Sequence, residues 1–271
     1  MPALQAKNLK KSYDGRFVVK GINVTIEPGE IIGFLGRNGA GKTTTFQMIA
    51  GLLKPNSGSV YLGDKNITRF SAPQRAHEGI TYLPQESSVF LNATVKNNLR
   101  LILEFQYADP EEREKISRRL LKELGLEDLA HQKAYSLSGG ERRRLEICRS
   151  LVLDPKYLFL DEPFTGIDPL TIIELQKILR TLKEKKISVI ISDHNVRDTF
   201  KVVDRAYIID DGQILIEGPP KQVAESPLAR EKFLGKDFTL GDEINPYSSS
   251  GGRRKTLSPK VSPGKKKNRK K

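Results

Sequence analysis

The hydrophobic pattern of the chain alternates between short apolar runs and longer stretches with helical spacing. The short runs are rich in β-branched residues and predict buried strands at residues 31–35, 157–160, 188–192 and 206–209. Residues 43–53 and 169–185 have the spacing of amphipathic helices, and one stripe of the second contains Ile172, Leu175, Ile178, Leu179 and Leu182. Strands that alternate with helices in this way predict an α/β fold whose largely parallel sheet is covered on both faces.

Two regions depart from this alternation. Residues 4–25 and 59–67 alternate apolar and polar positions around the turn signals Asp14-Gly15 and Gly63-Asp64, which predicts antiparallel strands. Residues 95–129 are almost wholly helical in pattern, with Pro110 near the start of a charged helix. We expect a helical insertion at about residues 95–137 within the α/β core, and we see no internal repeat.

The charge of the chain is concentrated at one end. The 271 residues carry a formal net charge of +13, but ten basic residues and no acidic one lie within residues 251–271. Without them the first 250 residues are near neutrality, so the charge is no argument that the main domain binds nucleic acid. We therefore expect an ordered domain over residues 1–242 and a basic, disordered tail over residues 243–271, where Gly, Ser, Pro and Lys predominate.

Three further features limit the class of protein. No apolar run approaches the roughly 20 residues that span a bilayer, and residues 1–11 lack the apolar stretch of a signal peptide. Cys148 is the only cysteine, which excludes disulfide scaffolds and cysteine-based zinc sites. These features predict a soluble protein of a reducing compartment.

A glycine-rich loop follows the first predicted buried strand and opens a helix. It matches the pattern G-x-x-x-x-G-K-[ST] with Gly36, Arg37, Asn38, Gly39, Ala40, Gly41, Lys42 and Thr43. The glycines let successive N–H groups point at phosphate oxygens, and the helix N-terminus adds partial positive charge. The alternative is an ordinary glycine-rich turn, but the strand-to-helix context favours a phosphate site with Lys42 on the β- and γ-phosphates and Thr43 on Mg²⁺.

Two other predicted strands end in polar residues. Asp161 and Glu162 follow residues 157–160, at the end of a sheet where α/β proteins bind ligands. Asp161 is a candidate for Mg²⁺ and Glu162 for orienting or deprotonating the attacking water; the alternative is a pair of capping acids. His194 follows residues 188–192 and is a candidate for contact with the γ-phosphate or Glu162, although isolated histidines are more often structural or exposed.

Leu137, Ser138, Gly139, Gly140 and Glu141 lie between these two sets of residues and resemble the signature motif of the ATP-binding cassette (ABC) ATPases. A plainer interpretation is a helix that begins with Ser138 as its N-cap and two glycines in the turn. Both interpretations can be true, because members of this family bind a γ-phosphate at the N-terminus of this helix.

Other positions then resemble family motifs in the expected order. Tyr13 resembles the aromatic residue that stacks on adenine, Gln85 the Q-loop glutamine, Asp168 the D-loop aspartate and His194 the switch histidine. The resemblance covers about residues 4–240. It implies the P-loop NTPase fold of an ABC nucleotide-binding domain, with an N-terminal antiparallel β subdomain and an inserted helical subdomain.

The resemblance also implies cofactors and site residues. ATP and Mg²⁺ are the implied cofactors. The implied ATP-binding residues are Tyr13, Gly36, Arg37, Asn38, Gly39, Ala40, Gly41, Lys42, Thr43, Thr44 and Gln85. The implied Mg²⁺ ligands are Thr43, Gln85 and Asp161, and the implied catalytic residues are Glu162, His194, Gln85 and Lys42. Ser138, Gly139, Gly140 and Glu141 are implied to bind the ATP of a partner subunit.

The family works as head-to-tail dimers with two ATP molecules at the interface, and this chain carries one set of motifs. The resemblance thus implies a homodimer that drives a separate pair of inner-membrane permease subunits from the cytoplasmic face of the membrane. Permease helices dock near the segment after Gln85 in this family, which makes Phe90 a candidate contact. The alternative for Phe90 is a place in the core.

Within the family, several longer strings are similar to the ATPases of lipopolysaccharide export. The strings are YLPQESSVF, LSGGERRRLEI, DEPFTGIDP, SDHNVRDTF and FLGKDF. The implied function is an ATP-hydrolysing motor with lipopolysaccharide as its indirect cargo. The alternatives are the ATPase of a branched-chain amino-acid importer, which shares some motifs, and a soluble ABC ATPase linked to nucleic acid or the ribosome, which would carry tandem cassettes or a long coiled-coil insertion.

Two features have no place in the family pattern. Cys148 stands where relatives more often have alanine, and a small buried residue is the simplest interpretation. The tail has no counterpart. Its basic residues suit contact with the anionic inner leaflet or non-specific contact with phosphates, and a solvated tail without a partner is the alternative.

Overall fold

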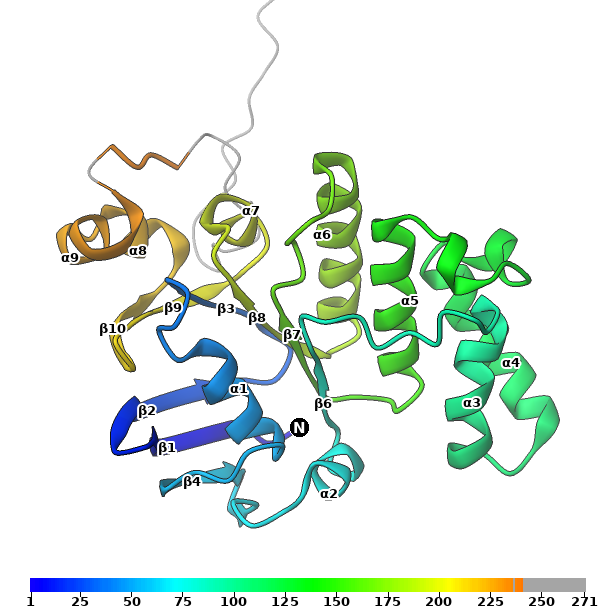
Figure 1. Cartoon of the computed structure of the whole chain (residues 1–271), viewed down its shortest axis with the longest axis horizontal. Coiled ribbons are helices and arrows are strands. Elements are labelled where there is room, and N and C mark those ends of the chain that lie inside the picture. Colours follow the sequence, from blue (N-terminus) through cyan, green and yellow to red (C-terminus); the bar gives the residue numbers. More distant parts are fainter. Residues whose placement is uncertain (236, 241–271) are drawn as a thin grey trace, which may run out of the picture.

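The structure of the chain, a computed structural model, describes residues 1–235 and 237–240. The predicted tail over residues 243–271 lies outside the described residues. The described part contains a large, mainly parallel sheet, a smaller antiparallel sheet and a group of helices on the side away from the antiparallel sheet (Figure 1).

The large sheet has six strands in the order β10-β9-β3-β8-β7-β6. Neighbouring strands from β9 to β6 are parallel, and β10 is antiparallel to β9. The bounds are β3 Ile31–Gly36, β6 Ile80–Leu83, β7 Tyr157–Asp161, β8 Ser188–Asp193, β9 Arg205–Asp210 and β10 Gln213–Gly218. The four predicted buried strands are confirmed, and β3, β7 and β8 are buried along their whole length because both faces of the sheet are covered.

The smaller sheet has the order β2-β1-β4-β5 and is antiparallel. Its strands are β1 Leu4–Tyr13, β2 Arg16–Ile26, β4 Ser57–Leu62 and β5 Lys65–Asn66. The predicted turns are confirmed, since Asp14 and Gly15 join β1 to β2 in the left-handed region. Gly58 allows β4 to approach β1, because a Cβ at this position would lie 2.3 Å from the backbone oxygen of Asn8.

Helix α1 (Lys42–Ala50) follows β3 and lies between the two sheets. It ends three residues earlier than the hydrophobic spacing predicted. Gly51 adopts φ +81° and stops the helix in a left-handed cap, so Leu52 and Leu53 continue as a turn. The apolar pattern persisted beyond the helix because Leu53 still packs against the core.

Four helices lie on the other face of the large sheet or at its edge. They are α5 (Gly139–Leu151), α6 (Pro169–Glu184), α7 (Val196–Phe200) and α8 (Pro220–Glu225). The short α9 (Pro227–Ala229) and a π-helical turn at Arg230–Leu234 follow α8, whereas the short α2 (Ala72–His77) lies near the end of α1 (Figure 1). Within the described ranges, no helix is both long enough and apolar enough to cross a lipid bilayer.

The predicted helical region contains α3 (Val95–Gln106), α4 (Pro110–Glu123) and two 3₁₀ turns at Glu127–Leu129 and Ala134–Ser136. Asp109 caps α4 through a hydrogen bond from the Glu111 N–H, and Pro110 occupies the first turn as predicted. Helices α3 and α4 pack on each other and lie beyond α5 (Figure 1). This region therefore meets the core through the helix that carries the signature motif.

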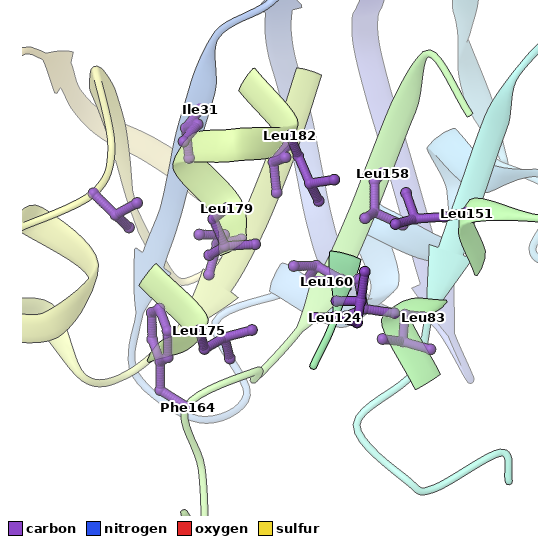
Figure 2. Packing of buried hydrophobic residues seen from close by; sticks show 14 of the residues in the cluster. Ile31, Leu83, Leu124, Leu151, Leu158, Leu160, Phe164, Leu175, Leu179 and Leu182 are labelled. Carbon is purple, nitrogen blue, oxygen red and sulfur yellow. The ribbon is translucent and has the colours of Figure 1, made fainter. Parts of the chain in front are cut away.

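Side chains of the central strands alternate between two hydrophobic cores. Leu158 and Leu160 of β7 point to the core under α5 and α6, where they meet Leu175, Leu179 and other residues (Figure 2). Tyr157 and Phe159 point to the other core, between the two sheets. There the rings of Phe34, Phe46 and Phe159 pack in a row, with centroids 5.5 Å and 5.1 Å apart.

Arg75 of α2 is a charged residue that the fold buries, with only 1% of its surface exposed. Its guanidinium donates to the backbone oxygens of Met48 and Ile49 at the end of α1, and to those of Thr68 and Phe70. Burial lowers the pKa of Arg75 to about 10. The side chain therefore supplies hydrogen bonds to four carbonyls, two of them buried, and it ties the end of α1 to the segment around α2.

We expect Arg75→Met to lower the free energy of unfolding by about 3 kcal/mol, because buried carbonyls lose charge-assisted donors. Urea denaturation followed by circular dichroism measures this change. Arg69→Met is the matched control, because Arg69 is exposed and should leave the unfolding midpoint unchanged. Equal midpoints for the two variants would contradict the structural role of Arg75.

Candidate active site

The glycine-rich loop connects β3 to α1 by a path that its glycines make possible. Gly39 and Gly41 have φ values of +80° and +101°. A Cβ at Gly36 would lie 2.3 Å from the Ile209 oxygen, and one at Gly41 would lie 2.8 Å from the Val18 oxygen. Gly41 is also the N-cap of α1 and has no side chain to occupy the first N–H groups of the helix. These N–H groups are therefore available to an anion.

Lys42 is folded back on the loop that carries it. Its Nζ donates to the backbone oxygens of Gly36 (2.8 Å) and Arg37 (3.1 Å), and only 5% of the residue is exposed. Burial lowers the pKa of Lys42, and the nearby carboxylates of Glu162 and Asp161 oppose this effect. The ammonium group is thus held by neutral carbonyls, which a phosphate can replace with a stronger, charged partner.

The loop forms one side of an open pocket of about 300 Å³, and two predicted site residues from other segments form the opposite side. The lining residues are Val18, Asn38, Gly39, Gly41, Lys42, Thr43, Thr44, Gln85 and Glu162. Tyr13 is not among them. It lies at the end of β1 with 47% of its surface exposed, and the Lys11 Nζ is 5.4 Å from its ring centroid.

Asp161 is the last residue of β7 and is 1% exposed. The Tyr82 hydroxyl of β6 donates to one carboxylate oxygen at 3.0 Å, and the Ser192 hydroxyl of β8 donates to the other. Arg143 of α5 donates to the Asp161 backbone oxygen at 3.1 Å. Burial raises the pKa of Tyr82, and the charge of Asp161 raises it further, so this hydroxyl keeps its proton.

Glu162 turns the chain out of the sheet with a left-handed backbone, at φ +45°. Its Oε2 accepts hydrogen bonds from Gln85 Nε2 (2.9 Å) and Thr165 Oγ1 (3.2 Å), and it lies 3.6 Å from His194 Nδ1. The structure thus brings together Gln85, Glu162 and His194, which three separate motifs supply. The His194 side chain is half-exposed, so it is open to a ligand in the adjoining pocket.

Asp193 supports the same end of the sheet, and sequence reasoning did not single it out. It is fully buried and accepts hydrogen bonds from the N–H groups of Phe164 (3.2 Å) and Asn195 (2.8 Å). Burial raises its pKa. Asp193 thereby ties the segment after β7 to the segment that carries His194.

Tyr82, Ser192 and Arg143 were also missed as members of the site. Polar residues at the ends of buried strands are the signal that could have indicated Ser192 and Asp193. Tyr82 gave no such signal, because a tyrosine within a short apolar run has the pattern of an ordinary core residue.

The signature residues form the start of α5 as the plainer interpretation predicted. The Ser138 hydroxyl accepts from the Glu141 N–H, and Glu141 Oε2 accepts from the Ser138 N–H at 2.8 Å. These bonds lower the pKa of Glu141. A Cβ at Gly140 would lie 2.3 Å from Cγ2 of Thr171, so α5 approaches the start of α6 closely.

Asp168 is the N-cap of α6 and accepts from the N–H groups of Leu170 and Thr171 and from the Thr171 hydroxyl. Its predicted D-loop position is thus next to the signature helix. Neither Asp168 nor Ser138 lines the glycine-loop pocket of its own chain. The structure leaves the two groups of predicted ATP-binding residues apart.

Phe90 is half-exposed, so the alternative that it belongs to the core is wrong for the described chain. The guanidinium carbon of Arg149 lies 4.7 Å from its ring centroid. The fully buried Asn98 of α3 accepts from the Phe90 N–H and donates to the Phe90 oxygen. An exposed ring on a firmly held backbone is suited to contact with another protein.

The fold and the site together define a P-loop ATPase: a glycine loop with a buried lysine faces a glutamate, a glutamine and a histidine at the carboxyl end of a parallel sheet. The model of the ABC transporter family matches residues 19–165. The chain belongs to this family and is one of its ATP-binding subunits. The predicted fold class and ATPase activity are confirmed.

Named relatives match along nearly the whole described chain. The lipopolysaccharide export system ATP-binding protein LptB of Acidithiobacillus ferridurans is 45% identical over 237 residues, which cover 88% of this chain and 98% of that protein. LptB of Escherichia coli K12 is 42% identical over 241 residues, which cover 89% of this chain and all of that protein.

Solved structures of ABC cassettes have the same fold as this chain. The ADP conformation of MJ1267, an ATP-binding cassette of an ABC transporter, has a TM-score of 0.78 and 29% identity, and the match covers 87% of this chain and all of that one. A dimeric structure of the bacterial transporter cassette MJ0796 has a TM-score of 0.72 and 27% identity, and covers 80% of this chain and 98% of that one.

We expect Lys42→Ala to weaken ATP binding by ~10- to 100-fold, because the variant loses a charge-assisted bond to phosphate. Titration with a fluorescent ATP analogue measures the affinity. Lys54→Ala is the control, since Lys54 is exposed and lies outside the pocket lining. Unchanged affinity in Lys42→Ala would contradict the assignment of the pocket to nucleotide.

Proposed function

We propose that the chain is the ATPase subunit of a transporter that drives lipopolysaccharide out of the inner membrane, and that it works at the cytoplasmic face with two permease subunits. The observation that carries this proposal is the 42–45% identity to LptB proteins over nearly their full length. The names of these relatives favour lipopolysaccharide export over the amino-acid importer and the soluble nucleic-acid-linked ATPase. Residues 243–271 would extend the ATPase domain as a basic tail.

The nucleotide would bind with its phosphates in the glycine loop. Gly41, Thr43 and Thr44 at the start of α1 line the pocket, so the first N–H groups of the helix would donate to the phosphates. Lys42 would exchange its two carbonyl partners for the β- and γ-phosphates. Tyr13 lies outside the pocket lining, and its exposed ring would stack on the adenine that extends beyond the loop.

Three residues would hold Mg²⁺, and all of them offer the hard oxygen ligands that this ion prefers. Thr43 is exposed in the pocket, Gln85 donates through Nε2 and so keeps its amide oxygen as a ligand, and Asp161 carries a charge on two oxygens. Bound Mg²⁺ would neutralise charge on the phosphates. The residues present fit the ion.

Glu162 would orient and deprotonate the attacking water. Gln85 and Thr165 fix its Oε2, and the pocket wall that it forms faces the glycine loop. A carboxylate held in this way could take a proton from the attacking water. His194 Nδ1, 3.6 Å from the same oxygen, would position Glu162 or contact the γ-phosphate.

A complete site would need a second copy of the chain. The start of α5 presents Ser138, Gly139 and Gly140 with the partial positive charge of a helix N-terminus, but these residues lie outside the pocket of their own subunit. In a head-to-tail homodimer each signature motif would bind the γ-phosphate held by its partner. The capping box would keep Ser138 in position, and Asp168 would lie at the same interface.

We expect Glu162→Gln to reduce ATP hydrolysis by ~10²–10⁴, because the variant loses its general base while ATP binding persists. Phosphate release measures turnover, and size-exclusion chromatography with ATP should show an accumulated dimer. Glu225→Gln on the exposed face of α8 is the control and should hydrolyse ATP at the normal rate. Normal turnover in Glu162→Gln would remove Glu162 from the mechanism.

The cargo is tested through the permeases. We expect the tagged chain to retain two permeases from detergent-solubilised membranes of its source organism, and the complex in vesicles to extract lipopolysaccharide only with ATP. Phe90→Ala should reduce permease recovery at least about tenfold, as expected for an interface anchor, whereas Leu52→Ala, an exposed control on another surface, should not. Recovery of an amino-acid permease instead would contradict the cargo assignment.

A further inference from the structure

The Asp161 carboxylate is held from both sides by hydroxyl groups of the neighbouring strands. The Tyr82 hydroxyl from β6 donates to Oδ2, and the Ser192 hydroxyl from β8 donates to Oδ1. Asp161 and Ser192 are paired in the parallel register, and their side chains therefore lie on one face of the sheet. With both oxygens fixed, rotation of the carboxylate about its last torsion is prevented.

The choice of donors matters as much as their position. A cation bonded to Asp161 would cancel the charge that attracts a metal ion, whereas a neutral hydroxyl fixes the carboxylate and leaves most of that charge in place. Lys42, which lines the pocket, donates to the Gly36 and Arg37 carbonyls instead. Arg143 donates to the backbone oxygen of Asp161 and not to its carboxylate.

We propose that Tyr82 and Ser192 are positioning residues for Mg²⁺, which orient the Asp161 carboxylate toward the ion or its water shell. This inference rests on the proposed Mg·ATP site. It concerns the metal rather than the nucleotide, since neither residue lines the glycine-loop pocket. The two hydroxyls therefore set how much Mg²⁺ the site requires.

The test uses the full chain and a fluorescent, non-hydrolysable ATP analogue, titrated with Mg²⁺ and, in parallel, without metal. We expect Tyr82→Phe and Ser192→Ala each to raise the Mg²⁺ concentration for half-maximal tightening of analogue binding by about tenfold. Affinity without metal should stay at the wild-type value. Tyr61→Phe, on the antiparallel sheet, is the control for a lost phenolic hydroxyl and should match the wild type in both titrations.

The outcomes separate the inference from the proposed function. A wild-type chain whose analogue binding is independent of Mg²⁺ would contradict the proposed metal site itself. A Mg²⁺-dependent wild type with unchanged Tyr82→Phe and Ser192→Ala would overturn only the positioning role. Weaker binding without metal would also overturn it, by indicating a general disturbance of the site. Ser192→Ala keeps the hydrogen bond from the Glu162 N–H to the backbone oxygen of residue 192. If this variant fails to fold, Tyr82→Phe decides the question, because it removes only a hydroxyl and keeps the ring.

Discussion

The parallel pairing of β3, β8 and β7 is the constraint on which the rest of the molecule depends. Their registers bring Leu35 opposite Asp193 and Asp161 opposite Ser192, so the three strands end at one level. Three of the groups proposed to act on phosphate leave the sheet from that edge: the glycine loop after β3, Glu162 after β7 and His194 after β8. The two hydrophobic cores stabilise this pairing by covering opposite faces of the same strands.

Much of the site was predictable because its motifs are local. Gly36 to Thr43 need only their own spacing to form a phosphate loop, and the acids after β7 need only their place at a strand end. Gln85, Glu162 and His194 were expected as catalytic residues from family resemblance, and in the structure Gln85 and His194 both lie next to the Glu162 carboxylate. The signature helix was predictable as a capped helix from Ser138 and Glu141 alone.

What escaped prediction depends on contacts between distant segments. Tyr82 becomes a site residue only because β6 pairs with β7, and a run of four residues carried too little pattern to identify that strand. The end of α1 was misplaced because Leu53 keeps apolar spacing past Gly51. Arg75 is of a residue type that is usually exposed, and its burial follows from the backbone carbonyls of two segments, 48–49 and 68–70, that accept its hydrogen bonds.

The hydrogen bonds between Asn98 and Phe90 couple the position of Phe90 to that of α3. The buried Asn98 side chain accepts from the Phe90 N–H and donates to the Phe90 oxygen. The residue that carries the exposed ring is therefore attached to α3 by two hydrogen bonds. Helix α3 in turn packs on α4 and on α5, whose first residues are the signature motif. Phe90, α3 and α5 are therefore joined by a short series of direct contacts, so a displacement of the ring would also displace the signature helix.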